Sequence, residues 1–305
     1  MAGKHTKSFF DFRKSVYAPS PVIRSNARAP LSLPFKIIII ALVASLVLSS
    51  VLVGNFFMQG SSHKKLLNTA AETFASFNSD DALKILAEQN GDIKGWLKIE
   101  GADIDCAVCQ SDDDTFYINH NQLGKKSRYG ALFLSKDDSF ERRGNDRNIV
   151  IFGNNMKNGT MFGSLKKYRN INFYKQNPFI ELYFDDEVQK YAVFSVMLVS
   201  SYADDSGEIY KPYKSHFADE NDFSLWAEET YARSLINTTV TAKYGDDFLT
   251  LVTVADDFDG ARLVVMAKKL TDWDSNHIDV SNSKVNAKIK YPKIWYDTRG
   301  LEYPH

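Results

Sequence analysis

The groups in this chain that could act as nucleophiles or bases are few, and they lie far apart in the sequence. Its two cysteines, Cys106 and Cys109, lie in the first half, and no cysteine follows them. No histidine lies between His120 and His216. A thiol becomes an effective nucleophile when a neighbouring imidazole takes its proton. A pair of Cys106 or Cys109 with His120 is therefore one arrangement to weigh, and its chemistry would be acyl transfer.

The spacing of the two cysteines favours structural thiols over a disulfide or a redox pair. Residues 104–108 have the apolar and β-branched character of a strand, and a separation of three places Cys106 and Cys109 on opposite faces of it. Side chains that point apart do not bridge without backbone movement. A redox pair would need a helix that begins after the first cysteine, and the residues here favour a strand. We expect both cysteines to be structural.

A second arrangement would pair a hydroxyl group with a carboxylate. Thr253, Ser200 and Ser201 supply the hydroxyl groups, and Asp256 or Asp257 would serve as the base. Acidic residues in polar loops usually face water, so we do not expect this pair to form.

The acidic run at 256–260 (DDFDG) raises the question of a calcium site. It lacks the regular acidic spacing and the distal Glu of a calcium-binding loop. We interpret it as a solvated turn, and the sequence predicts no metal and no cofactor.

The composition is that of a folded globular protein with one strongly charged end. The chain has 305 residues and a net charge of -1, with 44% hydrophobic and 25% charged residues, so nothing indicates nucleic-acid binding. Residues 1–36 nevertheless carry seven Lys and Arg and one Asp. This basic arm is also rich in Pro and Ser, which is typical of a flexible segment.

An apolar run without a charged residue follows at 37–58. Its length as a helix is roughly 33 Å, enough for a bilayer core of about 30 Å. A cleaved signal peptide is the alternative, but the basic region is too long and the apolar run exceeds the usual 7–15 residues. We predict an uncleaved single-pass anchor with a cytoplasmic N-terminus, so that residues 60–305 face outward.

Beyond the anchor, helical patterns give way to strand patterns. Ser61 and Ser62 can cap a first helix, and residues 78–81 (NSDD) end it and cap a second one that closes at 90–91. A longer amphipathic pattern predicts a helix over 219–236. The mainly β fold that we expect is a closed β-barrel. Its predicted strands lie at 96–99, 104–108, 130–134, 149–152, 179–184, 190–200, 248–254 and 262–267.

Several stretches, in the same order along the chain, resemble class B sortases. They are 95–101 (GWLKIEG), 116–121 (FYINHN), 129–134 (YGALFL), 148–168 (NIVIFGNNMKNGTMFGSLKKY) and 248–254 (FLTLVTV). Members of this family are membrane-anchored cysteine transpeptidases of Gram-positive bacteria. The resemblance implies N-terminal helices at 61–91 and a sortase-type barrel at 92–270. It leaves 271–305 as a C-terminal extension of unknown role.

The resemblance implies a catalytic Cys, His and Arg, and only the Arg is present. Asn154 stands at the family's His position, Val254 at its Cys position, and Arg262 at its Arg position. In the family a thiolate attacks the Thr carbonyl of a sorting signal, and a cell-wall amine then resolves the acyl-enzyme. Val254 has no nucleophilic atom, and the amide of Asn154 does not accept a proton near pH 7. Losing the nucleophile alone cost roughly 10⁶ in rate in one hydrolase.

We therefore predict a pseudoenzyme that binds or presents sorting-signal peptides, cooperates with an active sortase, or scaffolds cell-wall or pilus assembly. The resemblance also implies that His120 lies on a peripheral turn. Candidate groove residues are Arg262, Thr253 and Asn154, with Phe152, Met156 and Met161 as apolar residues of either the groove or the core.

Two other functions stay open. One is an active transpeptidase or hydrolase with a non-thiol nucleophile. The other is a purely structural surface anchor, in which the basic arm or the C-terminal extension recruits partners. Arg262 has two interpretations of its own, a salt bridge at the start of a strand or a retained peptide-binding group.

Overall fold

The computed structural model describes residues 32–140, 148–184, 187–203, 210, 212–214, 217–271 and 278–303. The chain divides into two compact units, one that ends at Phe57 and one that begins at Met58. Residues 1–31, which make up most of the predicted basic arm, lie outside the described residues.

The first described element, α1 (Leu33–Ser76), is one long helix that contains the apolar run. Its large apolar side chains from Leu33 to Met58 are exposed, and by length and composition alone the helix could cross a membrane. The predicted helix start at Ser61 and Ser62 is wrong, because α1 continues through both residues. A Gly and two Ser in a helix cost only about 1–2 kcal/mol, and packing of the following turns offsets that cost. His63 and Ala70 are buried there.

The break and the second helix follow the prediction. Helix α2 (Ser79–Gln89) begins after Asn78, whose side-chain Oδ1 accepts a hydrogen bond from the backbone N–H of Asp81 at 2.9 Å. This is an ordinary N-cap, which satisfies one of the free N–H groups of the first turn. The helix ends at Asn90, whose N–H donates to Leu86 O.

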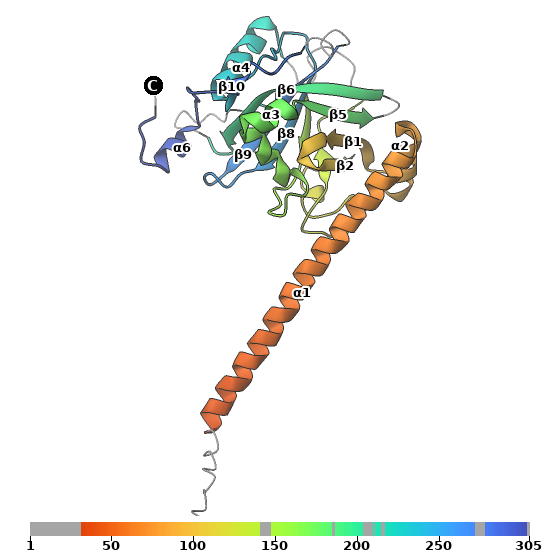
Figure 1. The fold of residues 1–305 in the computed structure, drawn as a ribbon, viewed down its shortest axis with the longest axis vertical. Helices are drawn as coiled ribbons and strands as arrows, with labels where there is room; N and C mark the ends of the chain where they lie inside the picture. Colours follow the sequence, from red (N-terminus) through yellow and green to blue (C-terminus); the bar gives the residue numbers. More distant parts are fainter. Residues whose placement is uncertain are drawn as a thin grey trace, which may run out of the picture. The chain divides into compact units, whose positions relative to one another are not determined.

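Eight strands among the described residues close into a barrel in the order β1-β2-β3-β4-β8-β9-β6-β5, and β5 pairs with β1 to complete it (Figure 1). The predicted mainly β fold with a closed barrel is thus confirmed. The strands are β1 (Ile93–Ile99), β2 (Ile104–Cys109), β3 (Leu132–Leu134), β4 (Asn148–Phe152), β5 (Phe179–Phe184), β6 (Glu187–Ser200), β8 (Phe248–Val254) and β9 (Ala261–Lys269).

Two parallel pairs interrupt the antiparallel order, β2 with β3 and β4 with β8. The second pair aligns Phe152 with Val252, so the carboxyl ends of β4 and β8 lie at the same edge of the barrel. A parallel pair requires a crossover connection, and here the long insertion between β6 and β8 is part of it. The candidate site residues Asn154 and Val254 lie at this edge.

Helix α4 (Glu220–Arg233) covers one side of the barrel (Figure 1). Its N-cap is Asp219, and its buried Trp226 packs on Phe248 of β8 and Phe194 of β6, with ring centroids 5.3 and 6.3 Å apart. The helix ends three residues before the predicted Ile236, because Ser234 begins the turn into the short strand β7 (Ile236–Asn237).

Short helices lie in the connections of the barrel. They are η1 (Glu100–Ala102), η2 (Phe116–Ile118), η3 (Phe162–Arg169) and α3 (Ile171–Gln176). The sequence predicted none of them. Asn170 caps α3 by accepting from the N–H groups of Asn172 and Phe173, which is a local signal that identifies the helix start.

The described part of the C-terminal extension is folded against the barrel. Strand β10 (Lys284–Val285) pairs with β7, and helix α6 (Lys293–Asp297) follows. The backbone N–H of Lys290 donates to Ala232 O, and Asn286 Nδ2 donates to Ser234 O at 2.8 Å. Tyr291 and Trp295 stack with centroids 4.0 Å apart. Residues 278–303 therefore belong to the barrel unit.

Candidate functional site

The three positions predicted from the sequence meet at the edge where β4 and β8 end. The N–H of Gly153 donates to Val252 O at 3.2 Å, and Thr253 Oγ1 donates to Gly153 O at 2.7 Å. Asn154 follows directly. Arg262 is the β9 partner of Val254. Pairing of the strands thus brings Asn154, Val254 and Arg262 to one place, although about a hundred residues separate the first from the others.

Val254 closes β8 with a side chain that is 48% exposed. The residues before it in the strand are buried. An exposed β-branched side chain suits the end of a strand, but it offers no lone pair and no proton. This position contributes shape and apolar surface only.

Asn154 has a structural role that the sequence did not reveal. Its side-chain Nδ2 donates to Ile118 O at 2.8 Å and to Tyr129 O at 3.2 Å. Its own carbonyl oxygen accepts from the N–H of Phe162. The amide thus joins the end of β4 to the loop between β2 and β3. A neutral imidazole carries one N–H and could make only one of these two bonds.

Gly130 makes room for this junction. Its φ is +66°, and a Cβ built on it would lie 2.5 Å from Tyr117 O and 2.8 Å from Asn154 Nδ2. Both the backbone conformation and the close approach require glycine here. The family-like stretch 129–134 therefore includes the residue against which the Asn154 amide packs.

Arg262 is half-buried, and its Nη1 donates to Ala261 O at 3.0 Å. It forms no ion pair with any described residue, so the salt-bridge interpretation finds no support among the described residues. Two aromatic side chains lie near it. Burial raises the pKa of Tyr213, and the charge of Arg262 opposes that rise. A hydrogen bond to Asp259 raises the pKa of Tyr202, and Arg262 again opposes it. The described neighbours of the guanidinium are thus two tyrosines and one backbone carbonyl.

The hydroxyl–carboxylate alternative is not assembled. Thr253 is 4% exposed, and its hydroxyl donates to the carbonyl of Gly153 rather than to a carboxylate. Ser201 Oγ donates to Gly260 O. Asp257 accepts two hydrogen bonds from Arg169 at 2.8 and 3.0 Å, and Asp256 is exposed. Among the described residues, the hydroxyls of Thr253 and Ser201 are thus bonded to backbone carbonyls and not to a carboxylate.

The thiols and His120 also lie outside any reactive arrangement. Cys106 and Cys109 are free and buried, in the interior cluster of the barrel and in a separate outer cluster respectively. Burial raises the pKa of Cys106 to about 12 and raises that of Cys109 as well. Both stay protonated at neutral pH. His120 stacks on Phe116 and donates from Nδ1 to Phe116 O at 2.8 Å.

The apolar candidates divide between core and rim. Met161 is 3% exposed and belongs to the core, so it is not a groove residue. Phe152 is half-buried, stacks on Phe133 at 5.4 Å and meets Tyr213 edge-on at 6.2 Å. Met156 is half-buried and packs against the core.

A small cavity of about 90 Å³ adjoins Val254. It is large enough for a few water molecules and not for a peptide. Its lining residues are Asn155, Phe162, Lys166, Arg169, Thr253, Val254, Ala255, Asp256, Asp257 and Leu263. A peptide at this site would therefore lie across the surface, with one side chain at most entering the cavity.

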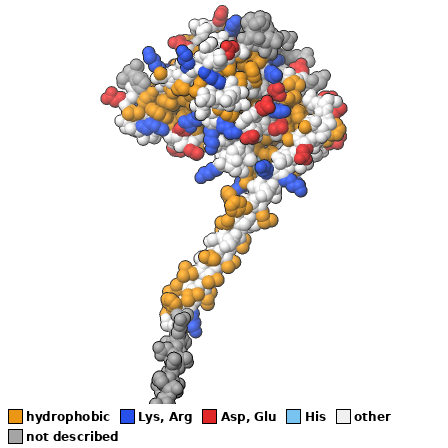
Figure 2. Space-filling view, in the orientation of Figure 1, with side chains coloured by type: hydrophobic (Ala, Val, Ile, Leu, Met, Phe, Trp, Pro, Cys, Tyr) orange, Lys and Arg blue, Asp and Glu red, His pale blue; other side chains and the backbone are white. Residues whose placement is uncertain are grey.

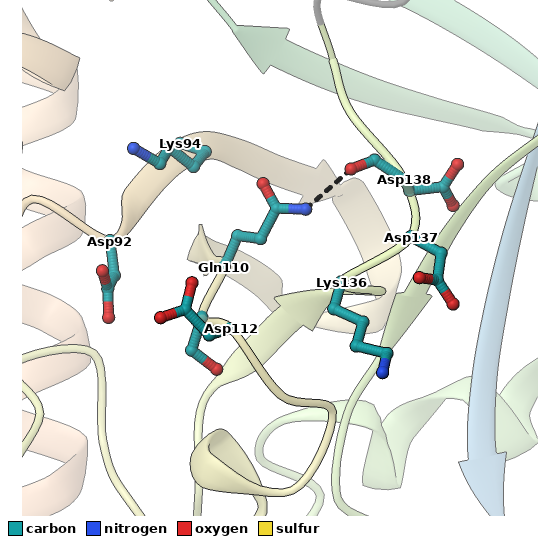
Figure 3. Close-up of a pocket in the computed structure, with 8 residues that line it drawn as sticks. Asp92, Lys94, Gln110, Asp112, Lys136, Asp137 and Asp138 are labelled. Carbon is teal, nitrogen blue, oxygen red and sulfur yellow. Dashed lines mark hydrogen bonds between the residues drawn. The ribbon is translucent and has the colours of Figure 1, made fainter.

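A larger hollow of about 560 Å³ lies elsewhere, between the start of β1, the end of β2 and the segment after β3 (Figure 3). Its labelled lining is Asp92, Lys94, Gln110, Asp112, Lys136, Asp137 and Asp138, and Gln110 Nε2 donates to Asp138 O at 2.8 Å. No predicted site residue lines it. Within the described part of the chain, no three His, Cys, Asp or Glu side chains converge as metal ligands.

Both the sequence comparison and the structure comparison find sortase B proteins. No family model matches the chain. The chain is 29% identical over 204 residues to sortase B of Listeria monocytogenes, which covers 66% of this chain and 79% of the relative. It superimposes on a Staphylococcus aureus sortase B–substrate complex with a TM-score of 0.63 at 22% identity, over 70% of this chain and 99% of the other. For Clostridium perfringens sortase B the TM-score is 0.55 at 32% identity, over 62% and 99%.

Proposed function

Because this chain belongs to the class B sortase family, we propose that it is a membrane-anchored member that binds a sorting-signal peptide without cleaving it. The observation that carries the proposal is the site at the end of β4 and β8. It holds an exposed valine and an amide whose two N–H groups are already bonded, beside an arginine without an ion-pair partner among the described residues.

The absence of cleavage follows from the two substituted positions. Acyl transfer requires an atom that attacks the carbonyl and a group that moves the proton. Val254 supplies no such atom. Asn154 does not titrate, and its amide protons are held by Ile118 O and Tyr129 O. The buried hydroxyl of Thr253 is bonded to Gly153 O, which argues against a non-thiol nucleophile.

The binding of a peptide is supported by what the site retains. Arg262 carries a fixed positive charge, and a guanidinium is well suited to peptide carbonyl oxygens or a carboxylate. Tyr202 and Tyr213 lie near it, and the exposed side chain of Val254 offers an apolar contact. Thr253 is too buried to touch a peptide except through the small cavity. A S. aureus sortase B has been solved as a substrate complex, which is the precedent for binding at this fold.

The cellular setting is part of the same proposal. The apolar part of α1 spans the membrane once, the basic arm at 1–36 stays in the cytoplasm, and the barrel unit faces outward. The organism is then Gram-positive, and the protein acts near its cell wall. The proposed division is arm 1–36, anchor 37–58, helices 61–91, barrel 92–270 and extension 271–305, with α1 running without a break from the anchor into the helical segment.

The test uses the full chain in detergent with fluorescent sorting-signal peptides and triglycine as the amine. We expect binding, measured by fluorescence anisotropy, and no cleaved or amide-linked product by mass spectrometry. Arg262→Ala should weaken binding about tenfold or more, since a charge-assisted contact contributes roughly 1.5–3 kcal/mol. Lys243→Ala, an exposed cation in the turn before β8, is the matched control.

Each alternative has its own outcome. Turnover that Thr253→Ala abolishes would establish a non-thiol enzyme and overturn the proposal. Failure of every peptide to bind, with the fold intact by circular dichroism, would leave the purely structural anchor.

A further inference from the structure

Three segments of the barrel unit carry only positive charge. Residues 58–71, 117–135 and 154–169 contain no Asp and no Glu, whereas the whole chain has 37 basic and 38 acidic residues. Their cations are Lys64, Lys65, Lys125, Lys126, Arg128, Lys157, Lys166, Lys167 and Arg169. A protein surface normally mixes both signs. Three long segments with only positive charges therefore indicate a surface that could bind an anionic partner.

Contacts of one buried histidine bring the three segments together. The ring of His63 in α1 stacks on Tyr129 with centroids 4.4 Å apart, and its Nε2 lies 3.3 Å from Met161 Sδ. Tyr129 belongs to the second segment and Met161 to the third. The amide of Asn154 adds a further link through Tyr129 O. The three segments thus lie next to one another, and each contributes exposed cations to the surface of the barrel unit.

We name this surface the basic face and define it by Lys64, Lys65, Lys125, Lys126, Arg128 and Lys157. All six side chains are exposed. Figure 2 shows Lys and Arg side chains gathered where α1 meets the barrel, with few acids among them. They lie on the segments that also hold Asn154 and Ile118, so the basic face and the candidate site are built on the same segments.

The ion pairs among the described residues involve other cations of these segments. Lys167 pairs with Asp103 and Arg169 with Asp257. The five lysines of the basic face form no ion pair with any described residue. Like charges that are not neutralised repel one another, and a partner of opposite sign would relieve that repulsion.

The chain itself indicates where such a partner lies. Met58 ends the apolar run, and Lys64 follows six residues later in the same helix, a rise of roughly 9 Å. Electrostatic attraction to a charged surface acts over about 8–10 Å at physiological salt. If residues 37–58 span the membrane, the first cations of the basic face lie within reach of its headgroups.

We propose that the basic face binds the anionic lipid headgroups of the outer leaflet and so holds the groove beside the membrane surface. This inference rests on the membrane anchor proposed above, but not on peptide binding. Such binding would fix the position of the candidate site relative to the membrane. Because Ile118 and Asn154 lie on the docked segments, a peptide in the groove would be received close to the bilayer, where a membrane-attached protein would present it.

The test measures lysine accessibility on the full chain in nanodiscs. One set contains phosphatidylcholine only, and the other contains 30% phosphatidylglycerol. An amine-acylating reagent followed by mass spectrometry reports the modification rate of each lysine. We expect the five lysines to react several-fold more slowly in the anionic nanodiscs, and 0.5 M salt to remove the difference. Lys243 and Lys288, exposed on other segments, are internal controls that should react equally in both.

A charge-reversal variant sharpens the result. Lys125→Glu with Lys126→Glu should restore fast acylation of Lys64, Lys65 and Lys157 in anionic nanodiscs, since each lysine at such a surface changes the docked population roughly fivefold. Lys243→Glu should change nothing. Equal rates in the two lipids, or protection that only a soluble polyphosphate produces, would overturn the proposal.

The two proposals fail in different ways. A chain that does not enter nanodiscs at all disproves the anchor and this inference with it. Peptide binding in detergent, where no leaflet is present, should be the same for the Lys125→Glu, Lys126→Glu variant and the wild type. Normal peptide binding with no lipid-dependent protection would remove the docking surface and leave the binding function.

Discussion

The two positions that the resemblance assigns to the family's His and Cys differ in what their side chains do for the fold. Asn154 donates both amide protons to backbone carbonyls of the loop between β2 and β3. Val254 ends β8 with its side chain 48% exposed. One replacement is part of the hydrogen-bond network, and the other is a surface residue.

The two side chains therefore contribute differently to the stability of the fold. An amide that satisfies two carbonyl groups stabilises the junction between the end of β4 and the loop between β2 and β3. A neutral imidazole could not make both bonds. Val254, by contrast, places an exposed apolar side chain at the end of its strand. Asn154→His should therefore lower the free energy of unfolding, whereas Val254→Cys should leave it unchanged. The predictions below test that asymmetry.

The largest effect is expected at the glycine against which the Asn154 amide packs. Gly130→Ala should lower the free energy of unfolding by about 3 kcal/mol or more, because the new Cβ would meet Tyr117 O and Asn154 Nδ2 at a φ of +66°. Gly124→Ala is the matched control, since its φ is +68° with no atom within 4 Å of the new Cβ. It should lose only about 1–2 kcal/mol. Denaturant unfolding in detergent measures both, and equal losses would contradict a crowded junction.

Asn154 itself should give the next largest effect. Asn154→Ala removes two hydrogen bonds and leaves two carbonyls without a donor, so the loss of stability should be about 2 kcal/mol. Asn154→His should lose about half as much, because one N–H remains. Asn155→Ala is the control. Its half-buried side chain makes no hydrogen bond within the described part of the chain, and we expect a change within about 0.5 kcal/mol. If all three variants have the same free energy of unfolding, the Asn154 amide does not stabilise the loop between β2 and β3.

Strands were predictable where their signal is local. The apolar run of β8 and the alternating run of β5 match the predicted ranges because a turn or a Pro bounds each. The role of Asn154 could not be predicted in this way. Its partners, Ile118 O and Tyr129 O, precede it by 36 and 25 residues, and a backbone carbonyl leaves no trace in the sequence.

Long-range packing also explains the remaining differences. The predicted start at Ser61 fails because His63 docks on Tyr129 and keeps α1 helical there. Strand β10 is only two residues long and is defined by its pairing with β7. A segment this short has no hydrophobic periodicity from which it could be predicted. The three positions that the resemblance assigns to the family's catalytic residues lie together because β4 pairs with β8 and β8 pairs with β9.

The contact of α1 with the site wall should make stability depend on pH. Burial lowers the pKa of His63 from 6.5 to about 4. Below pH 6.5 the unfolded chain takes up a proton that the folded protein does not, so stability is complete above pH 6.5 and is lost as the pH falls toward 4. The loss should be about 2 kcal/mol between pH 6.5 and 4.5.

His63→Phe is the comparison for this prediction, since the new ring can still stack on Tyr129 but does not titrate. Other groups also titrate in this range, so the informative quantity is the difference between the two pH profiles of unfolding. That difference should grow as the pH falls. Parallel profiles would mean that folding leaves the pKa of His63 unchanged.

The smallest change in stability should come from Val254→Cys, within about 0.5 kcal/mol, because the side chain is exposed at a strand end. The new thiol should nevertheless be easy to follow. Both native cysteines are buried with raised pKa values, so labelling by iodoacetamide reports the new residue alone. Without an imidazole at position 154 it should react as an ordinary thiol, with a midpoint near pH 8.5, and should not cleave a sorting peptide. A midpoint well below pH 7 would mean that another group of the site activates a nucleophile here, and the pocket would then be less inert than its two substitutions imply.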